Sequence, residues 1–131
     1  MSLHINAATL LNLDASVNVD TEGTAYQVVP LETDQTKDAD MEFDVVFNLT
    51  GSGGASTPTM DAAVQGSVNG TDWFDVTTMT QMSTNGTTLE AKAVAKVYPY
   101  IRAILKLGGG TKMNTTGTIT LTAAGGYKLV A

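Results

Sequence analysis

Four acidic residues alternate with other residues along one short segment, namely Asp38, Asp40, Glu42 and Asp44. Carboxylates are calcium ligands, but calcium needs about six to eight oxygens that converge on one point. Residues two apart on a strand lie roughly 6.6 Å from each other, so such a row forms a stripe and not a cage. We expect a solvated strand face or, as the second interpretation, a surface that contacts a positively charged protein. No metal site is expected.

Residue types that usually carry catalysis are sparse. His4 is the single histidine, and there is no cysteine, so a Ser-His-Asp arrangement would need its base near the N-terminus, a poor place for a rigidly held group. Two carboxylates that meet in space could still hydrolyse a glycosidic bond, but a small sandwich offers no obvious cleft. The glycine-rich run 108–112 lacks the spacing of a phosphate-binding loop. We expect no catalytic residue, no cofactor and no enzymatic activity.

Aromatic residues could provide a different chemistry, stacking on sugars. Trp73, Tyr98 and Tyr100 could form such a platform, as in carbohydrate-binding modules. The chain has one Trp, four Tyr and three Phe, eight aromatic residues in all. With so few, packing in the core is the stronger explanation for Trp73.

Charge is distributed unevenly along the chain. The net charge is −6, which disfavours binding to a phosphate backbone, so no nucleic-acid partner is expected. Residues 1–49 hold nine acids and one base, which gives −8, and residues 50–131 hold four acids and six bases, which gives +2. An electropositive partner could therefore face the N-terminal part.

The absence of cysteine and the hydropathy of the chain indicate in which compartment the protein is made. There is no cysteine, which favours synthesis in a reducing cytoplasm. No apolar run approaches the roughly 20 residues that span a bilayer, and the N-terminus does not resemble a signal peptide. We therefore expect no membrane partner.

The elements that must position these residues are strands. Threonine and valine are abundant, which favours pleated sheets, and segments 41–49, 60–68, 100–107 and 118–124 alternate apolar with polar residues. Gly-rich turns separate them. The pattern predicts an all-β protein: an antiparallel β-sandwich of about eight strands within residues 16–131, with residues 1–15 as an N-terminal arm or as a first strand.

The hairpin signal Asn69-Gly70 is the strongest local signal in the chain. A strict two-residue turn would place Trp73 over Gly66, but it would also turn Asp75 inward. This conflict predicts a β-bulge or a longer loop, with Gly70 at positive φ.

Three short motifs resemble a pattern in jelly-roll capsid decoration proteins, also called cement proteins, of tailed phages. They are Gln65-Gly-Ser-x-Asn-Gly-Thr-Asp-Trp73-x-Asp-Val76, then Tyr98-Pro-Tyr-Ile-Arg102, then Gly117-Thr-Ile-Thr-Leu121. The resemblance covers roughly the C-terminal half. It implies a jelly-roll sandwich without catalytic residues, made in the host cytoplasm, that binds the outer surface of the phage head. The implied partners are the major capsid protein and further copies of the chain, as a dimer or trimer.

The expected function is therefore a non-enzymatic virion protein that stabilises the capsid lattice. Residues expected at its interface are the apolar N-terminal set and the acidic stripe: Leu3, Ile5, Leu10, Leu11, Asp38, Asp40, Glu42 and Asp44. One alternative is a carbohydrate-binding module of a tail fibre, a spike or an enzyme, and another is a structural protein of the tail or baseplate.

Overall fold

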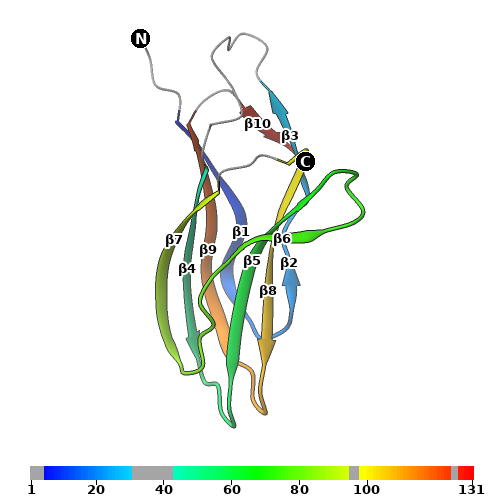
Figure 1. Cartoon of the computed structure of the whole chain (residues 1–131). Helices are drawn as coiled ribbons and strands as arrows, with labels where there is room; N and C mark the ends of the chain where they lie inside the picture. Colours follow the sequence, from blue (N-terminus) through cyan, green and yellow to red (C-terminus); the bar gives the residue numbers. More distant parts are fainter. Residues whose placement is uncertain (1–4, 31–42, 95–97, 125–126) are drawn as a thin grey trace.

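Two antiparallel sheets packed face to face form the protein (Figure 1). The computed structural model describes residues 5–30, 43–94, 98–124 and 127–131. Sheet A has the order β1-β9-β4-β7, with bounds Ile5–Val17, Asn114–Ala124, Phe43–Ser52 and Gly86–Val94. Sheet B has the order β10-β3-β8-β5-β6, with bounds Tyr127–Val130, Tyr26–Pro30, Tyr100–Gly108, Thr59–Ser67 and Phe74–Thr78, and β2 (Thr21–Glu22) also pairs with β8. The predicted antiparallel β-sandwich is confirmed.

The strand order is that of a jelly roll. If β2 and β3 are treated as one interrupted strand and β10 as an addition, eight strands remain. Sheet A then contains the first, eighth, third and sixth of them, and sheet B the second, seventh, fourth and fifth. The described residues form ten strands, close to the predicted number of about eight, because the second strand is interrupted and a short strand follows the last long one.

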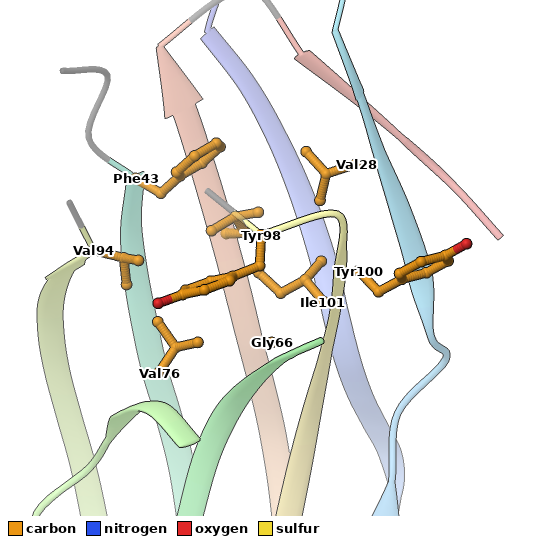
Figure 2. A pocket seen from close by; sticks show the side chains of 9 residues that line it. Val28, Phe43, Gly66, Val76, Val94, Tyr98, Tyr100 and Ile101 are labelled. Carbon is orange, nitrogen blue, oxygen red and sulfur yellow. The ribbon is translucent and has the colours of Figure 1, made fainter. Parts of the chain in front are cut away.

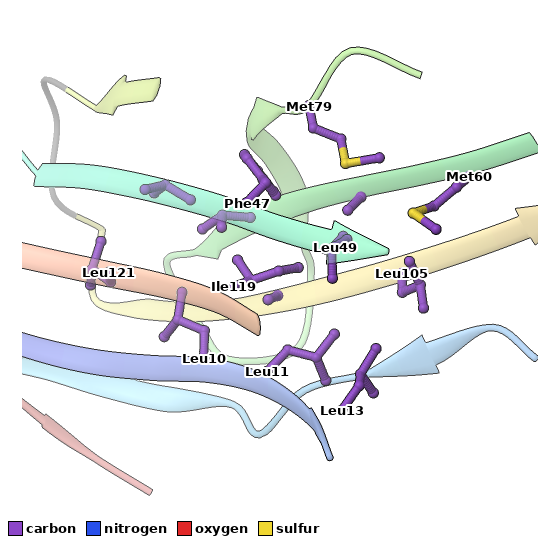
Figure 3. Close-up of a cluster of buried hydrophobic side chains, with 14 of the residues drawn as sticks. Leu10, Leu11, Leu13, Phe47, Leu49, Met60, Met79, Leu105, Ile119 and Leu121 are labelled. Atoms are coloured by element: carbon purple, nitrogen blue, oxygen red, sulfur yellow. The ribbon is translucent and has the colours of Figure 1, made fainter. Parts of the chain in front are cut away.

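The core lies between the sheets and follows the predicted alternation (Figure 3). In β4 and β9 the inward side chains have 4% or less of their surface exposed: Phe43, Val45, Phe47, Leu49, Ile119 and Leu121. Ala103, Leu105 and Leu107 of β8 are buried against them. The predicted strand 60–68 ends one residue early: Val68 is 68% exposed, because β5 ends at Ser67 and the chain turns away.

The N-terminal segment is a strand of the sandwich, at least from Ile5 onward. β1 pairs with β9, with register shifts between Thr9 and Leu11 and between Leu13 and Val17. The first shift is a bulge. This bulge lets two consecutive residues, Leu10 and Leu11, face the core, where they are 2% and 7% exposed. Their prediction as docking residues was therefore wrong, since their side chains already pack inside the molecule.

The β5–β6 hairpin has the longer loop that the sequence suggested. Gly66 pairs with Phe74 and Gln65 with Asp75, with a register shift between Val64 and Gln65, and Gly70 has a φ of 78°. A side chain on Gly66 would contact the ring of Tyr98 at 3.0 Å. Val76 lies at 2.9 Å from the same position, so Tyr98 and Val76, and not Trp73 as the strict turn suggested, cover this glycine.

Candidate interaction surfaces

The loop 68–73 is held together by hydrogen bonds to two short polar side chains. The Asn69 Oδ1 atom accepts hydrogen bonds from the backbone N–H groups of Thr71 (2.9 Å) and Asp72 (2.8 Å). The Ser67 Oγ atom, which is fully buried, accepts from the N–H groups of Asn69 (3.2 Å) and Gly70 (2.8 Å). The loop folds over β8, because a side chain on Gly70 would meet the ring of Tyr100 at 3.4 Å.

Trp73 lies on the outer face of sheet B, where it stacks with Arg102. The guanidinium carbon of Arg102 is 4.4 Å from the ring centroid, a cation–π contact. The Arg102 Nε atom donates to the Gln65 Oε1 atom (2.9 Å), and Gln65 Nε2 donates to the Asp75 carboxylate (3.0 Å). Arg102 also forms an ion pair with Glu22 (3.4 Å). The first two motifs of the sequence pattern therefore form one connected unit, and Trp73 is not a core residue.

Replacing Asn69 with alanine is expected to loosen this unit. The loop would lose hydrogen bonds to two backbone N–H groups, which we estimate at about 1–2 kcal/mol of unfolding free energy. Because Trp73 is the single tryptophan, its fluorescence should become more accessible to acrylamide. A matched control is Asn85→Ala, which removes two hydrogen bonds to Gly54. It should lower stability without changing the quenching of Trp73, and equal quenching in both variants would contradict the assignment.

Two shallow hollows occupy the outer face of sheet B, of about 360 Å³ and 340 Å³. They share Ile104 and Lys106. Carboxylates and cations surround them: Asp20, Glu22, Asp61, Asp75, Arg102 and Lys106. Gln81 donates to both oxygens of Asp61, at 3.1 and 3.0 Å. This face is polar and strongly charged, and its hydrogen-bonding groups could bind a polyhydroxylated ligand.

The outer face of sheet A has a different character. Its side chains form cross-strand rows, one of which is Thr9, Thr120, Val46 and Ala91, and the next Asn12, Thr118, Asn48 and Leu89. A third row joins Thr116, Thr50 and Thr87, and a fourth joins Thr122, Asp44 and Ala93. Asp44 is the one charged side chain in these rows. Asp14, exposed on β1, adds a second carboxylate at the edge of the sheet. The rest of the face is a pleated surface of short, uncharged side chains.

Figure 2 shows a small cavity at one end of the sandwich, lined by residues of both sheets. Its volume is about 20 Å³, enough for little more than one water molecule. The rings of Tyr98 and Tyr100 point in opposite directions there (Figure 2), so the two residues do not form a common stacking platform. The cavity is a gap in the packing and not a ligand site.

Of the eight predicted interface residues, three have described side chains. Leu10 and Leu11 are in the core, and Asp44 is exposed on β4 at the outer face of sheet A. Ile5 pairs with Ala124 at the start of β1. Leu3 and three members of the acidic stripe lie outside the described residues, namely Asp38, Asp40 and Glu42. The structure therefore places one predicted residue on a surface. The face around it was missed, although the run of threonines at alternate positions in 116–122 was a usable signal.

Glu90, on β7, has a pKa below its usual value of 4.5. The main cause is the hydrogen bond that its carboxylate accepts from the Thr80 N–H (3.1 Å), and the Lys92 ammonium 3.2 Å away adds to it. Both favour the ionised carboxylate. Glu90 therefore fastens the β6–β7 connection to the edge of sheet A at neutral pH.

Within residues 5–30, 43–94, 98–124 and 127–131, no group of three His, Asp or Glu side chains is placed to hold a metal ion. The same residues include no helix of the length and hydropathy needed to cross a membrane. In comparisons with known proteins, no family model matched the chain and no curated protein proved similar to it.

Proposed function

We propose that this protein is a non-enzymatic structural component of a phage virion, which binds the outer surface of the head and stabilises the capsid lattice. The observation that carries the proposal is the outer face of sheet A. Interface centres are poor in charged residues, and this face would require little desolvation of charge on docking. The outer face of sheet B, with six charged side chains around its hollows, would require much more.

The size of the face favours a repeated partner. Four strands about 4.8 Å apart and four rows about 6.6 Å apart give roughly 500 Å² of flat sheet. Stable complexes bury about 800 Å² on each partner, so one contact alone would be weak. A capsid offers many identical sites, and copies that also contact one another there would bind multivalently, which makes the summed interaction strong.

The exposed carboxylate of Asp44 favours a partner whose surface is positively charged at this position. It lies in the row with Thr122 and Ala93, and the sequence that precedes it supplies the other acidic residues of the stripe. The major capsid protein would meet this end with basic side chains. Resemblance of the three sequence motifs to phage decoration proteins supports the same assignment.

Reconstitution tests this function. Capsids assembled without the protein should bind it at a fixed stoichiometry and then resist heat better, which can be followed by sedimentation and by release of packaged DNA on heating. Absence of binding to capsids of the same phage would refute the proposal.

A second candidate function is carbohydrate binding on the outer face of sheet B. The hollows that meet at Ile104 and Lys106 favour it, because carboxylates and amides around an apolar floor suit sugar hydroxyls and ring faces. Against it, Arg102 occupies one face of the Trp73 ring. Binding of the purified protein to a glycan array, lost on mutation of Asp61 or Asp75, would support this second function.

A further inference from the structure

The edges of the two sheets differ in how open they are to another strand. Natural proteins blunt exposed edges with bulges or very short strands. Here β1 contains two register shifts, β6 pairs through a bulge, and β10 has four residues. β7 has none of these features: it keeps one continuous register with β4 from Phe43 opposite Val94 to Gly51 opposite Gly86. No other described strand pairs with its outer edge (Figure 1).

The side chains of β7 are self-complementary. Glu90 and Lys92 lie two residues apart on the same side of the strand, 3.2 Å from each other, with 23% and 41% of their side-chain surfaces exposed. On the opposite side, Leu89 is 74% exposed between short side chains. A strand with this pattern can face a second copy of itself so that each charge meets its opposite.

We propose that β7 pairs with β7 of a second copy, antiparallel and about a two-fold axis at Ala91. In this register Glu90 lies opposite Lys92 of the second copy, and Leu89 lies opposite Ala93 of the second copy. Both charges are then paired across the interface, and the exposed leucine gains Ala93 of the second copy as a neighbour.

Other registers are less favourable. Centring the pair on Glu90 places two carboxylates opposite each other, and centring it on Lys92 places two ammonium groups opposite each other; like charges in this position destabilise a sheet. Centring it on Leu89 brings two leucines together but places Glu90 opposite Thr88. The alternating charges therefore select Ala91 as the centre.

The pairing would join two copies of sheet A into one eight-stranded sheet. Because the axis is perpendicular to the sheet, both outer faces point the same way. The flat face would grow from roughly 500 to roughly 1,000 Å² by the same strand spacings. The dimer rests on β7 alone and is independent of the capsid proposal, although it would strengthen the docking that we propose.

Disulfide trapping tests the register. Because the chain has no native cysteine, a disulfide can form only between the introduced cysteines. In the proposed dimer, residue 91 of one copy lies directly opposite residue 91 of the second copy. Ala91→Cys should therefore form an intermolecular disulfide under mild oxidation, and Ala93→Cys, the matched control two residues away, should not. Trapping through Leu89→Cys and not through Ala91→Cys would overturn the proposed register.

Charge exchange tests the pairing without a cross-link. Glu90→Lys and Lys92→Glu should each raise the dimer dissociation constant roughly tenfold or more, because each places like charges opposite each other. Mixing the two variants should restore dimers, since the lysine introduced at position 90 of one variant would then face the glutamate introduced at position 92 of the other. Analytical ultracentrifugation over a dilution series, with circular dichroism to confirm folding, gives the readout. A wild-type protein that stays at 13.6 kDa at every concentration, together with no disulfide at position 91, would overturn the proposal.

Discussion

Replacing Gly117 with alanine is expected to destabilise the protein by about 4 kcal/mol or more, a large part of the 5–15 kcal/mol that a domain of ordinary stability has. Gly117 lies in β9, opposite Leu13 on one side and Leu49 on the other, with a φ of 126°. A side chain there would overlap the backbone oxygen of Asn48 and would lie 2.9 Å from the Leu49 Cα atom. The obstacle is backbone, so β4 and β9 would have to separate. Urea unfolding, followed by circular dichroism, measures the loss.

Gly86→Ala separates the two causes of this effect. Gly86 also has a positive φ, of 156°, but nothing lies within 4 Å of the position where its side chain would be. This control variant has backbone strain without a steric clash, so its free energy of unfolding should fall by only about 1–2 kcal/mol. Equal losses in the two variants would show that strain, and not the close approach of β4, makes Gly117 necessary.

The sequence predicted best those features that depend on local pattern. Phe43, Val45, Phe47 and Leu49 alternate inward as predicted, because one face of β4 is buried and the period of a strand is two. The conflict at Asp75 correctly predicted a bulge and a positive φ at Gly70. Both inferences need only neighbours in the chain or across one turn.

Features that depend on distant contacts were harder to predict. Leu10 and Leu11 were predicted to be an apolar docking segment. Both face the core because of a bulge in β1, and this bulge depends on pairing with Ile119, more than 100 residues away in the sequence. The local sequence therefore does not reveal it. Trp73 was assigned to the core because the chain has few aromatic residues, but its partner Arg102 comes from β8, which is distant in the sequence. The interaction surface on sheet A was not predicted for the same reason. Its rows of side chains combine four strands that are not consecutive in the chain.

Thr120→Arg is expected to weaken capsid binding by roughly 30-fold or more, with little change in stability. Thr120 is in an inner strand of sheet A, between Thr9 and Val46, near the middle of the proposed docking face. A long cation there would hold two flat surfaces apart and would have to be desolvated, and central interface residues commonly account for 2 kcal/mol or more, about 30-fold. Co-sedimentation of each variant with capsids measures the effect.

Thr78→Arg is the matched control, because it introduces the same side chain at an exposed strand position of sheet B, beside Ala63 and one of the hollows. If the outer face of sheet A binds the capsid, Thr78→Arg should bind capsids as the wild type does. If the outer face of sheet B is instead a glycan site, Thr78→Arg should lose glycan binding and Thr120→Arg should keep it. The two variants thus assign each ligand to one face, and capsid binding that survives Thr120→Arg but not Thr78→Arg would reverse the assignment of the docking surface.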